Sequence, residues 1–173
     1  MRFCLLLLVF LLSALTPARA DMVDAAFDRA ISQFETARPK LPTELFGVDV
    51  GAYRAALTFR QFTSSHWGGT VTMRVENGSE TSNSCARFAA FVRLPPRDGQ
   101  VSLVLCPQFS TDGADALRTL TILHELVHVV AGPNECRAMA FAAQVEQAAT
   151  GRFTDVSNYW RANGCEASSF SLP

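Results

Sequence analysis

Residues 121–138 read TILHELVHVVAGPNECRA and contain two of the three histidines in the chain. His124 and His128 are four residues apart, so on a helix their imidazoles lie on one face, about 6 Å apart along the axis. Gly132 and Pro133 then end the helix. Apolar residues bracket the histidines as on a buried helix, at Leu120, Leu123, Leu126, Val127 and Val130. The stretch therefore predicts a core helix that carries two metal-ligand side chains on one face.

Glu125 directly follows the first histidine, which gives the pattern H-E-x-x-H. In this pattern the two histidines bind zinc, and the glutamate reaches a water on the metal without binding the metal itself. Zinc lowers the pKa of that water to near 7, and a carboxylate can take its proton as the water attacks a carbonyl group. We therefore expect a Zn²⁺ site with His124 and His128 as ligands and Glu125 as the catalytic base.

Two glutamates are candidates for the third ligand. Glu135 begins the next predicted helix, seven residues after His128, and a chain reversal at Gly132-Pro133 would return it to the first helix. Glu146 lies three turns further along the same helix. Glu135 could instead complement the positive end of the helix dipole, and Glu146 could be a solvated surface charge. We expect Glu135 to complete the site, with Glu146 as the alternative.

The segments TILHELVH and N-E-C-R-A resemble the zincin metallopeptidases, and among them the glutamate-ligand gluzincins such as the thermolysin-like enzymes. The resemblance covers residues 100–150. It implies that His124, His128 and Glu135 bind zinc and that Glu125 is the general base. It also implies a peptide or protein substrate, cleaved at a peptide bond.

The resemblance further implies a sheet whose edge strand holds the substrate in extended form, and residues 101–105 are the candidate for that strand. Two features depart from the thermolysin-like pattern. The gap between His128 and Glu135 is shorter, and Met139 stands where those enzymes carry an aspartate that supports a histidine ligand. In the metzincins a glycine turn also brings a third ligand soon after the second histidine, so the branch within the zincins stays open.

Hydrophobic periodicity and turn residues predict the other elements. Ser110, Thr111 or Asp112 can cap the metal-site helix, and Asn134 can cap the helix after it. The expected elements are an amphipathic helix at 21–38, an ambiguous helix or strand at 50–62, a strand at 70–75, a hairpin of 88–94 with 101–105, and helices at 114–130, 135–149 and 156–162. This order predicts an α+β fold, a small zincin-like single domain with an antiparallel or mixed sheet, an active-site helix and a following glutamate helix.

The N-terminus, MRFCLLLLVFLLSALTPARA, has a basic start, an apolar run and a small-x-small end. These are the three parts of a secretory signal peptide, and we expect cleavage after Ala20. The apolar run is too short for a bilayer span, which needs about 20 residues. We therefore expect a signal peptide at 1–20, one domain at 21–173, no membrane anchor after cleavage, and a secreted or periplasmic protein.

Cysteine usage agrees with export. Once Cys4 has left with the signal peptide, four cysteines remain, and an even number in an exported chain suggests two disulfide bonds. Four cysteines allow three pairings, of which we favour Cys85–Cys106, which flank the predicted hairpin, together with Cys136–Cys165. None of the spacings is the short one typical of structural zinc sites.

Composition and motifs narrow the functional classes. The chain has 15 basic and 16 acidic residues with no basic cluster, which argues against nucleic acid and anionic membranes as partners. We therefore expect an exported zinc metallopeptidase, a hydrolase. The alternative is a secreted binding or structural module that keeps the zinc-site helix without turnover. Two further residues are weaker candidates: His66 for substrate or oxyanion binding, and Tyr159 for a hydrogen bond to the tetrahedral intermediate, although packing beside Trp160 is favoured for it.

Overall fold

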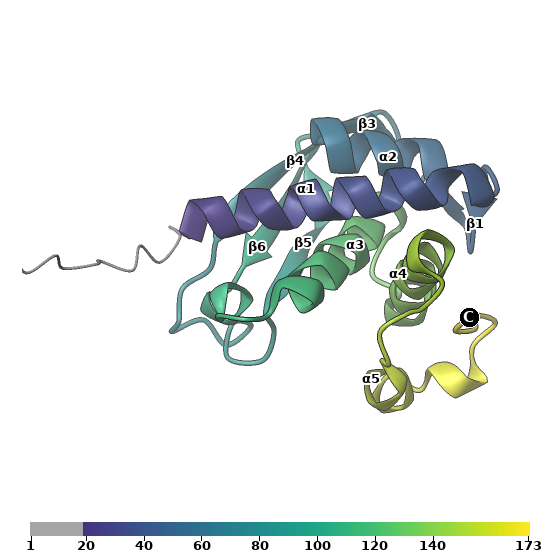
Figure 1. The fold of residues 1–173 in the computed structure, drawn as a ribbon. Helices are drawn as coiled ribbons and strands as arrows, with labels where there is room; N and C mark the ends of the chain where they lie inside the picture. Colours follow the sequence, from purple (N-terminus) through teal and green to yellow (C-terminus); the bar gives the residue numbers. More distant parts are fainter. Residues whose placement is uncertain (1–18) are drawn as a thin grey trace, which may run out of the picture.

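The main sheet of the protein has four strands, and helices cover one of its faces (Figure 1). The computed structural model describes residues 19–173. In Figure 1, α1 runs across the front, the sheet and α3 lie behind it, and α4 leads to α5 and the C-terminus. The elements in chain order are α1 (Arg19–Ala37), β1 (Glu44–Leu45), β2 (Val48–Asp49), α2 (Val50–Phe59), β3 (Gln61–Thr63), β4 (Thr70–Asn77), β5 (Ala90–Arg97), β6 (Gln100–Leu105), α3 (Asp115–Ala131), α4 (Glu135–Thr150) and α5 (Ser157–Ala162), with short 3₁₀ turns η1 (Arg38–Lys40), η2 (Pro107–Ser110) and η3 (Cys165–Ala167).

The predicted α+β class is confirmed, and so are the positions of most helices and strands. The ambiguous segment 50–62 contains one element of each kind, α2 and then β3. Arg60 separates them in a left-handed conformation (φ 55°), with its amide donating to Ala56 O. The predicted signal peptide falls mostly on residues 1–18, which lie outside the described residues, while Arg19 and Ala20 begin α1. No helix within residues 19–173 has both the length and the hydrophobicity that a membrane span requires.

The sheet is mixed, with the strand order β3-β4-β6-β5. The β3–β4 and β6–β5 pairs are antiparallel, whereas β4 and β6 run parallel, with Thr72 opposite Gln100 and Asn77 opposite Leu105. The expectation that residues 101–105 form the edge strand is therefore wrong. Strand β6 pairs with β5 on one side and with β4 on the other, so β6 is internal. Its hairpin partner β5 lies at the edge of the sheet.

Helix α3 lies at the centre of the helical layer, and buried side chains hold it in place. Alternate residues of β4, among them Val71 and Met73, are buried, and α1 contributes a stripe that includes Phe27 and Phe34. Tyr53 of α2 is completely buried, and its hydroxyl donates to Leu123 O on α3 at 2.8 Å. The peptide group just before His124 is therefore held by a side chain from the core.

The start of α3 differs from the prediction. Its N-cap is Ala114, and no side chain caps the helix. Of the expected caps, Ser110 ends η2 with its buried hydroxyl unpaired among the described residues, and the Thr111 hydroxyl donates to Gln108 O at 2.8 Å. Arg118, in the first turn of α3, donates to Thr111 O at 2.6 Å and pairs with Asp115. The helix start is thus held by a buried arginine rather than by a hydroxyl cap.

Both predicted disulfide bonds are present. Cys85–Cys106 joins the loop before β5 to the end of β6, and Cys136–Cys165 joins the first turn of α4 to the C-terminal segment. The second bond is surrounded by a small apolar cluster separate from the main core, with Met139, Ala140 and Trp160 buried in it.

Gly78 offers a test of the packing around the first disulfide. A Cβ atom at this position would overlap Cys85 Sγ and lie 3.1 Å from Val104 and 3.2 Å from Cys106 Sγ. We expect Gly78→Ala to lower the free energy of unfolding by about 1–3 kcal/mol in urea titrations, since overpacking forces the neighbours to shift. The control is Ser79→Ala, one residue later, whose hydroxyl forms hydrogen bonds within residues 19–173 with Thr81 alone. Equal stability of the two variants would show that the sulfur atoms can move at no cost.

Candidate metal centre

A tight turn brings α3 and α4 together. Gly132 ends α3 with a φ of 87°, and its amide donates to His128 O at 3.1 Å. The Asn134 side chain then caps α4 by accepting from the Arg137 amide at 2.9 Å, as predicted, and the Arg137 guanidinium donates to Ala131 O at 2.6 Å. These contacts span the turn from both sides. They place Glu135, the first residue of α4, directly beside the histidine face of α3.

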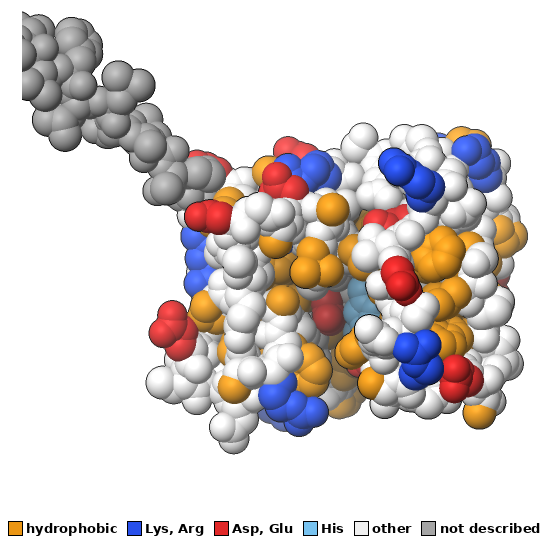
Figure 2. Space-filling model, turned by 60° about the horizontal axis from the view of Figure 1, so that its bottom comes forward, with side chains coloured by type: hydrophobic (Ala, Val, Ile, Leu, Met, Phe, Trp, Pro, Cys, Tyr) orange, Lys and Arg blue, Asp and Glu red, His pale blue; other side chains and the backbone are white. Residues whose placement is uncertain are grey.

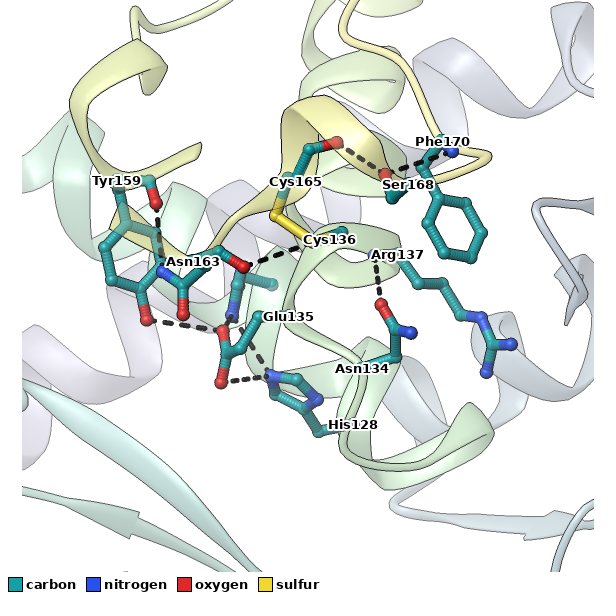
Figure 3. Close-up of a disulfide and its surroundings, with 11 residues drawn as sticks. His128, Asn134, Glu135, Cys136, Arg137, Tyr159, Asn163, Cys165, Ser168 and Phe170 are labelled. Atoms are coloured by element: carbon teal, nitrogen blue, oxygen red, sulfur yellow. Dashed lines mark hydrogen bonds and ion pairs between the residues drawn. A yellow bond between two sulfur atoms is a disulfide. The ribbon is translucent and has the colours of Figure 1, made fainter. Parts of the chain in front are cut away.

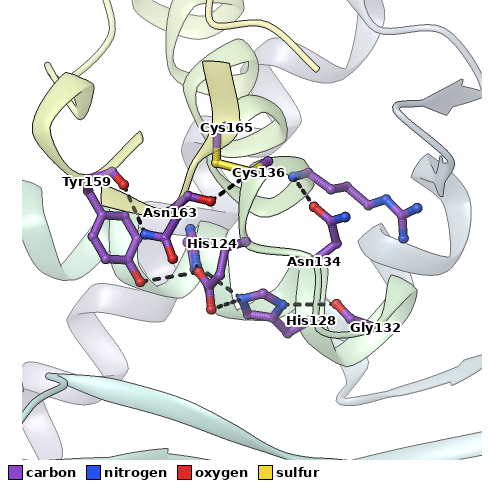
Figure 4. A network of polar contacts seen from close by, with 10 residues as sticks. His124, His128, Gly132, Asn134, Cys136, Tyr159, Asn163 and Cys165 are labelled. Carbon is purple, nitrogen blue, oxygen red and sulfur yellow. Dashed lines mark hydrogen bonds and ion pairs between the residues drawn. A yellow bond between two sulfur atoms is a disulfide. The ribbon is translucent and has the colours of Figure 1, made fainter. Parts of the chain in front are cut away.

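The side chains of His124, His128 and Glu135 lie close together: Figure 4 shows the two histidines, and Figure 3 shows Glu135 beside His128. His124 Nε2 lies 3.1 Å from His128 Nε2 and 3.1 Å from Glu135 Oε2, and His128 Nε2 lies 3.5 Å from Glu135 Oε1. Ligand atoms 2.0–2.1 Å from a tetrahedral zinc ion are about 3.3–3.4 Å apart. Each of these contacts, two of which use different oxygens of Glu135, is close to that spacing, and one ligand atom from each of the three side chains lies within 4.8 Å of the others, so the group could hold a metal ion.

Hydrogen bonding orients one of the two imidazoles. His128 Nδ1 lies 3.0 Å from Gly132 O, a carbonyl that can only accept, so Nδ1 carries the proton in the neutral ring. The lone pair is then on Nε2, which faces His124 and Glu135. Metal-binding histidines commonly donate their second nitrogen to a carbonyl or carboxylate in this way. The backbone of the turn therefore fixes the tautomer that a metal requires.

Glu146, the alternative third ligand, lies elsewhere. Its carboxylate accepts hydrogen bonds from the Thr154 amide at 2.8 Å and the Thr154 hydroxyl at 3.2 Å, and the residue is 9% exposed. It is therefore neither beside the histidines nor a solvated surface charge. It fixes the chain that follows α4, and among the described residues it is Glu135 that joins the histidine pair.

Glu125 is buried beside the histidines and lines the cavities on either side of them. Burial raises the pKa of Glu125, and the charges of His124 and His128 only partly oppose this shift. Within residues 19–173, no hydrogen bond to the Glu125 carboxylate is present, so its oxygens are free to accept one. A buried carboxylate in such a setting has the free acceptor atoms and the elevated pKa that a general base needs.

Tyr159 reaches the site from α5 (Figure 3). Its hydroxyl donates to Glu135 Oε2 at 3.3 Å, and its ring lies 6.3 Å from the ring of His124. Burial and the negative charge of Glu135 raise the pKa of Tyr159 to about 12, so the hydroxyl keeps its proton at neutral pH. Trp160, beside which Tyr159 was expected to pack, is buried in the cluster around the second disulfide, whereas Tyr159 is 41% exposed.

His66 lies behind the turn, outside the ligand cluster. A Cβ atom on Gly132 would be 2.7 Å from His66 Nε2, which places the imidazole against the backbone of the turn. The neighbouring Trp67 donates from Nε1 to Val129 O at 2.7 Å, near the end of α3. Residues 64–69 therefore support the outer side of the metal-site turn.

The pKa shifts in the cluster make the stability of the metal-free protein depend on pH. Burial lowers the pKa of His128, but Glu135, Glu125 and the Gly132 carbonyl together raise it above its usual value. That shift stabilises the fold below about pH 6.5, and the contribution is lost as the pH rises through the folded pKa. Burial likewise opposes the charge of Glu135, but hydrogen bonds from both histidines hold its pKa well below the usual range. This second contribution is present above about pH 4.3 and is lost as the pH falls.

We therefore expect the metal-free protein to have a larger free energy of unfolding at about pH 5.5 than at about pH 3 or pH 8. With zinc bound, stability should instead rise with pH above about 6, because the metal requires unprotonated imidazoles. Urea titrations of chelated and zinc-loaded protein measure both profiles. In the metal-free protein, His128→Gln should remove the part of the decrease in unfolding free energy between pH 5.5 and 8 that His128 causes. If the decrease is unchanged in this variant, other groups cause it.

Comparisons with protein-family models, with curated proteins and with solved structures found no match to this chain. The interpretation of the site therefore depends on its own geometry. That geometry brings together His124, His128 and Glu135 as donors that could hold a metal ion, with Glu125 and Tyr159 beside them.

Proposed function

We propose that the protein is an exported, zinc-dependent metallopeptidase. The observation that carries the proposal is the placement of a buried carboxylate without a donor, Glu125, next to three converging metal-ligand side chains. These groups border open cavities, so a substrate can reach them. A structural metal site would enclose the ion with four protein ligands and would have no use for an accessible base.

The donor set favours zinc. Two imidazole nitrogens and one carboxylate oxygen are the ligands of many catalytic zinc sites, which keep a fourth position open for water or substrate. Calcium and magnesium prefer sites made of oxygen atoms alone. His124, His128 and Glu135 would hold the ion, and the Gly132 carbonyl would orient His128 behind it.

Zinc, when bound, lowers the pKa of a water molecule and polarises the carbonyl group of the substrate. Glu125 would accept the proton released as the water attacks and, once protonated, could pass that proton to the departing amine. The Tyr159 hydroxyl, which donates to Glu135 Oε2 at 3.3 Å, would turn from that bond to donate to the carbonyl oxygen as negative charge develops there.

The edge strand β5 supports a peptide as the substrate. The Cys106 amide donates to Ala89 O at 2.8 Å, so in this antiparallel pair residues 89, 91 and 93 bond to β6. Ala90 and Val92 then direct their main-chain groups towards the open edge of the sheet. Both residues line a cavity that also includes Glu125 and His128. An extended peptide can add to this edge as a further strand, with its scissile bond beside the base.

The case for export combines the N-terminal signal pattern with the two disulfide bonds. Disulfide bonds persist in the periplasm and outside the cell and are rare in the cytosol. The proposed compartment is therefore the periplasm or the medium, and the peptide substrate would be met there.

The test measures zinc content and proteolysis on the same purified protein. We expect one zinc ion per chain and cleavage of β-casein that stops after chelation with 1,10-phenanthroline and returns when zinc is added. Zinc-loaded protein that leaves casein and mixed peptides intact would contradict the proposal. It would favour a secreted binding or structural module that keeps the site without turnover.

A further inference from the structure

The candidate metal centre opens to the outside beside strand β5. On the face shown in Figure 2, a histidine lies at the bottom of a hollow, with hydrophobic side chains around it. The cavity that contains Glu125 is bordered by Ala90 and Val92 of this strand. A peptide that pairs with the free edge of β5 would therefore pass the metal centre and continue along the strand.

A second cavity, of about 510 Å³, borders the same strand and also includes Gln100 and Ser102 of β6. On β6 these two residues alternate with Val101 and Leu103, which are buried in the main core. Because successive side chains of a strand point to opposite faces, Gln100 and Ser102 face away from the core. The second cavity therefore lies on the face of the sheet opposite the helices (Figure 1).

Two arginines of β5, Arg93 and Arg97, line this second cavity, and none of its lining residues is acidic. They lie opposite Ser102 and Gln100 in the β5–β6 pair, so their side chains share that face of the sheet. Glu76 of β4 accepts a hydrogen bond from Ser102 at 2.7 Å and lies 3.9 Å from Arg93, which is beyond hydrogen-bonding distance. The Arg93 side chain is 64% exposed. The cavity thus presents positive charge that a ligand can reach.

A peptide on the β5 edge would present its side chains to the two cavities in turn. Residues opposite each other on neighbouring strands point to the same face of a sheet. Val92 lines the cavity of the metal centre, so the peptide residue opposite it points there. The peptide residue opposite Arg93 points to the second cavity. One face of the same peptide therefore meets the metal centre while the other face meets the arginines.

We infer that Arg93 and Arg97 select substrates that carry aspartate or glutamate on the face turned away from the metal, within about three residues of the scissile bond. The inference deepens the proposed peptidase function and rests on it. A guanidinium group matches a carboxylate in both charge and hydrogen-bonding geometry. Each such pair at an exposed site changes an affinity by up to about fivefold, so two arginines can give a measurable preference.

Binding without turnover is measured first. Zinc-loaded Glu125→Gln protein is titrated with acetyl-Val-Asp-Val-Asp-Val-Asp-Val-amide and with the same peptide in which asparagine replaces aspartate. In an extended chain, all the aspartates of this peptide lie on one face. At low ionic strength we expect the aspartate peptide to bind about 3- to 10-fold more tightly, and at about 0.5 M salt less than about twofold, because salt screens exposed charges. Equal binding of the two peptides at low ionic strength would overturn the inference.

Substitutions of arginine locate the contact. Arg93→Gln combined with Arg97→Gln should remove the preference for the aspartate peptide and leave the zinc content unchanged. Arg74→Gln is the matched control, because Arg74 is exposed and lies opposite Ser102 on the same face, but β6 separates its strand from β5. This control should keep the parental preference. If Arg74→Gln lowers the preference as much as the double substitution does, the peptide responds to overall charge and the assignment to Arg93 and Arg97 is overturned.

Turnover by the parent enzyme separates the inference from the proposed function. Mass spectrometry of a digested peptide mixture identifies the cleaved bonds, and we expect acidic residues to be enriched about two- to fivefold within about three residues of them. A parent that cleaves the mixture without this enrichment keeps the peptidase assignment and refutes the acidic preference. A parent that cleaves nothing, while the Glu125→Gln protein binds the aspartate peptide selectively through Arg93 and Arg97, keeps the binding site and refutes the peptidase.

Discussion

Glu125→Gln is expected to abolish peptide cleavage while the protein stays folded and keeps its metal. The amide has nearly the same shape but cannot accept the proton of the attacking water, and losing a general base costs about 10²–10⁴-fold in rate. The metal should remain because His124, His128 and Glu135 are untouched. Stability should not fall, since burial already disfavours the charged form of Glu125.

The measurements are the rate of β-casein cleavage, zinc per chain and the midpoint of thermal unfolding. Glu80→Gln, the same change at an exposed position, serves as the control and should match the parent in all three. Cleavage by Glu125→Gln at the parental rate would rule out Glu125 as the base, whatever its metal content.

Glu135→Gln is expected to weaken zinc binding by more than about 100-fold, whereas Glu146→Gln should leave it unchanged. Replacing a residue that only supports a metal ligand already costs about 10- to 100-fold in affinity, and a direct ligand should cost more. The two glutamates lie on the same helix, but only Glu135 contacts the histidines, while Glu146 binds Thr154. Zinc affinity is measured by competition with a chromophoric chelator.

Glu146→Gln also reports on stability. It loses charge-assisted hydrogen bonds to Thr154, so its free energy of unfolding should fall by about 1–3 kcal/mol without any loss of zinc. The opposite pattern, with zinc lost from Glu146→Gln and kept by Glu135→Gln, would mean that the helices rearrange on metal binding and that the third ligand has been misassigned.

The central helices could be predicted from the sequence because their signals are local. The period of apolar residues around His124 and His128 defines the buried helix, and the Gly132-Pro133 break with Asn134 after it defines the turn. A turn of that length places Glu135 opposite the preceding helix. The Cys85–Cys106 pair was predictable for a similar reason, since these two cysteines bracket a hairpin, and Cys136 and Cys165 are then the two that remain.

The remaining features depend on contacts between distant parts of the chain. The parallel pair of β4 and β6 joins strands that are separated by a crossover. No turn motif in the sequence indicates this pairing, so the edge strand was predicted wrongly. Tyr159 enters the site only because the last segment folds back over α4, which its own sequence does not reveal. Glu146 likewise reads as a surface charge until Thr154 is placed beside it.

The tie between Cys136 and Cys165 also sets an order of assembly. The two histidines, Glu125 and Glu135 are synthesised before the segment that carries Tyr159, and that segment is tied to α4 by a disulfide one residue away from Glu135. Cytosolic thiols are kept reduced, so this tie forms only after the chain reaches an oxidising compartment. Under the proposed export, the wall of the site that Tyr159 provides is thus the last part to be secured, after the chain has left the cytosol.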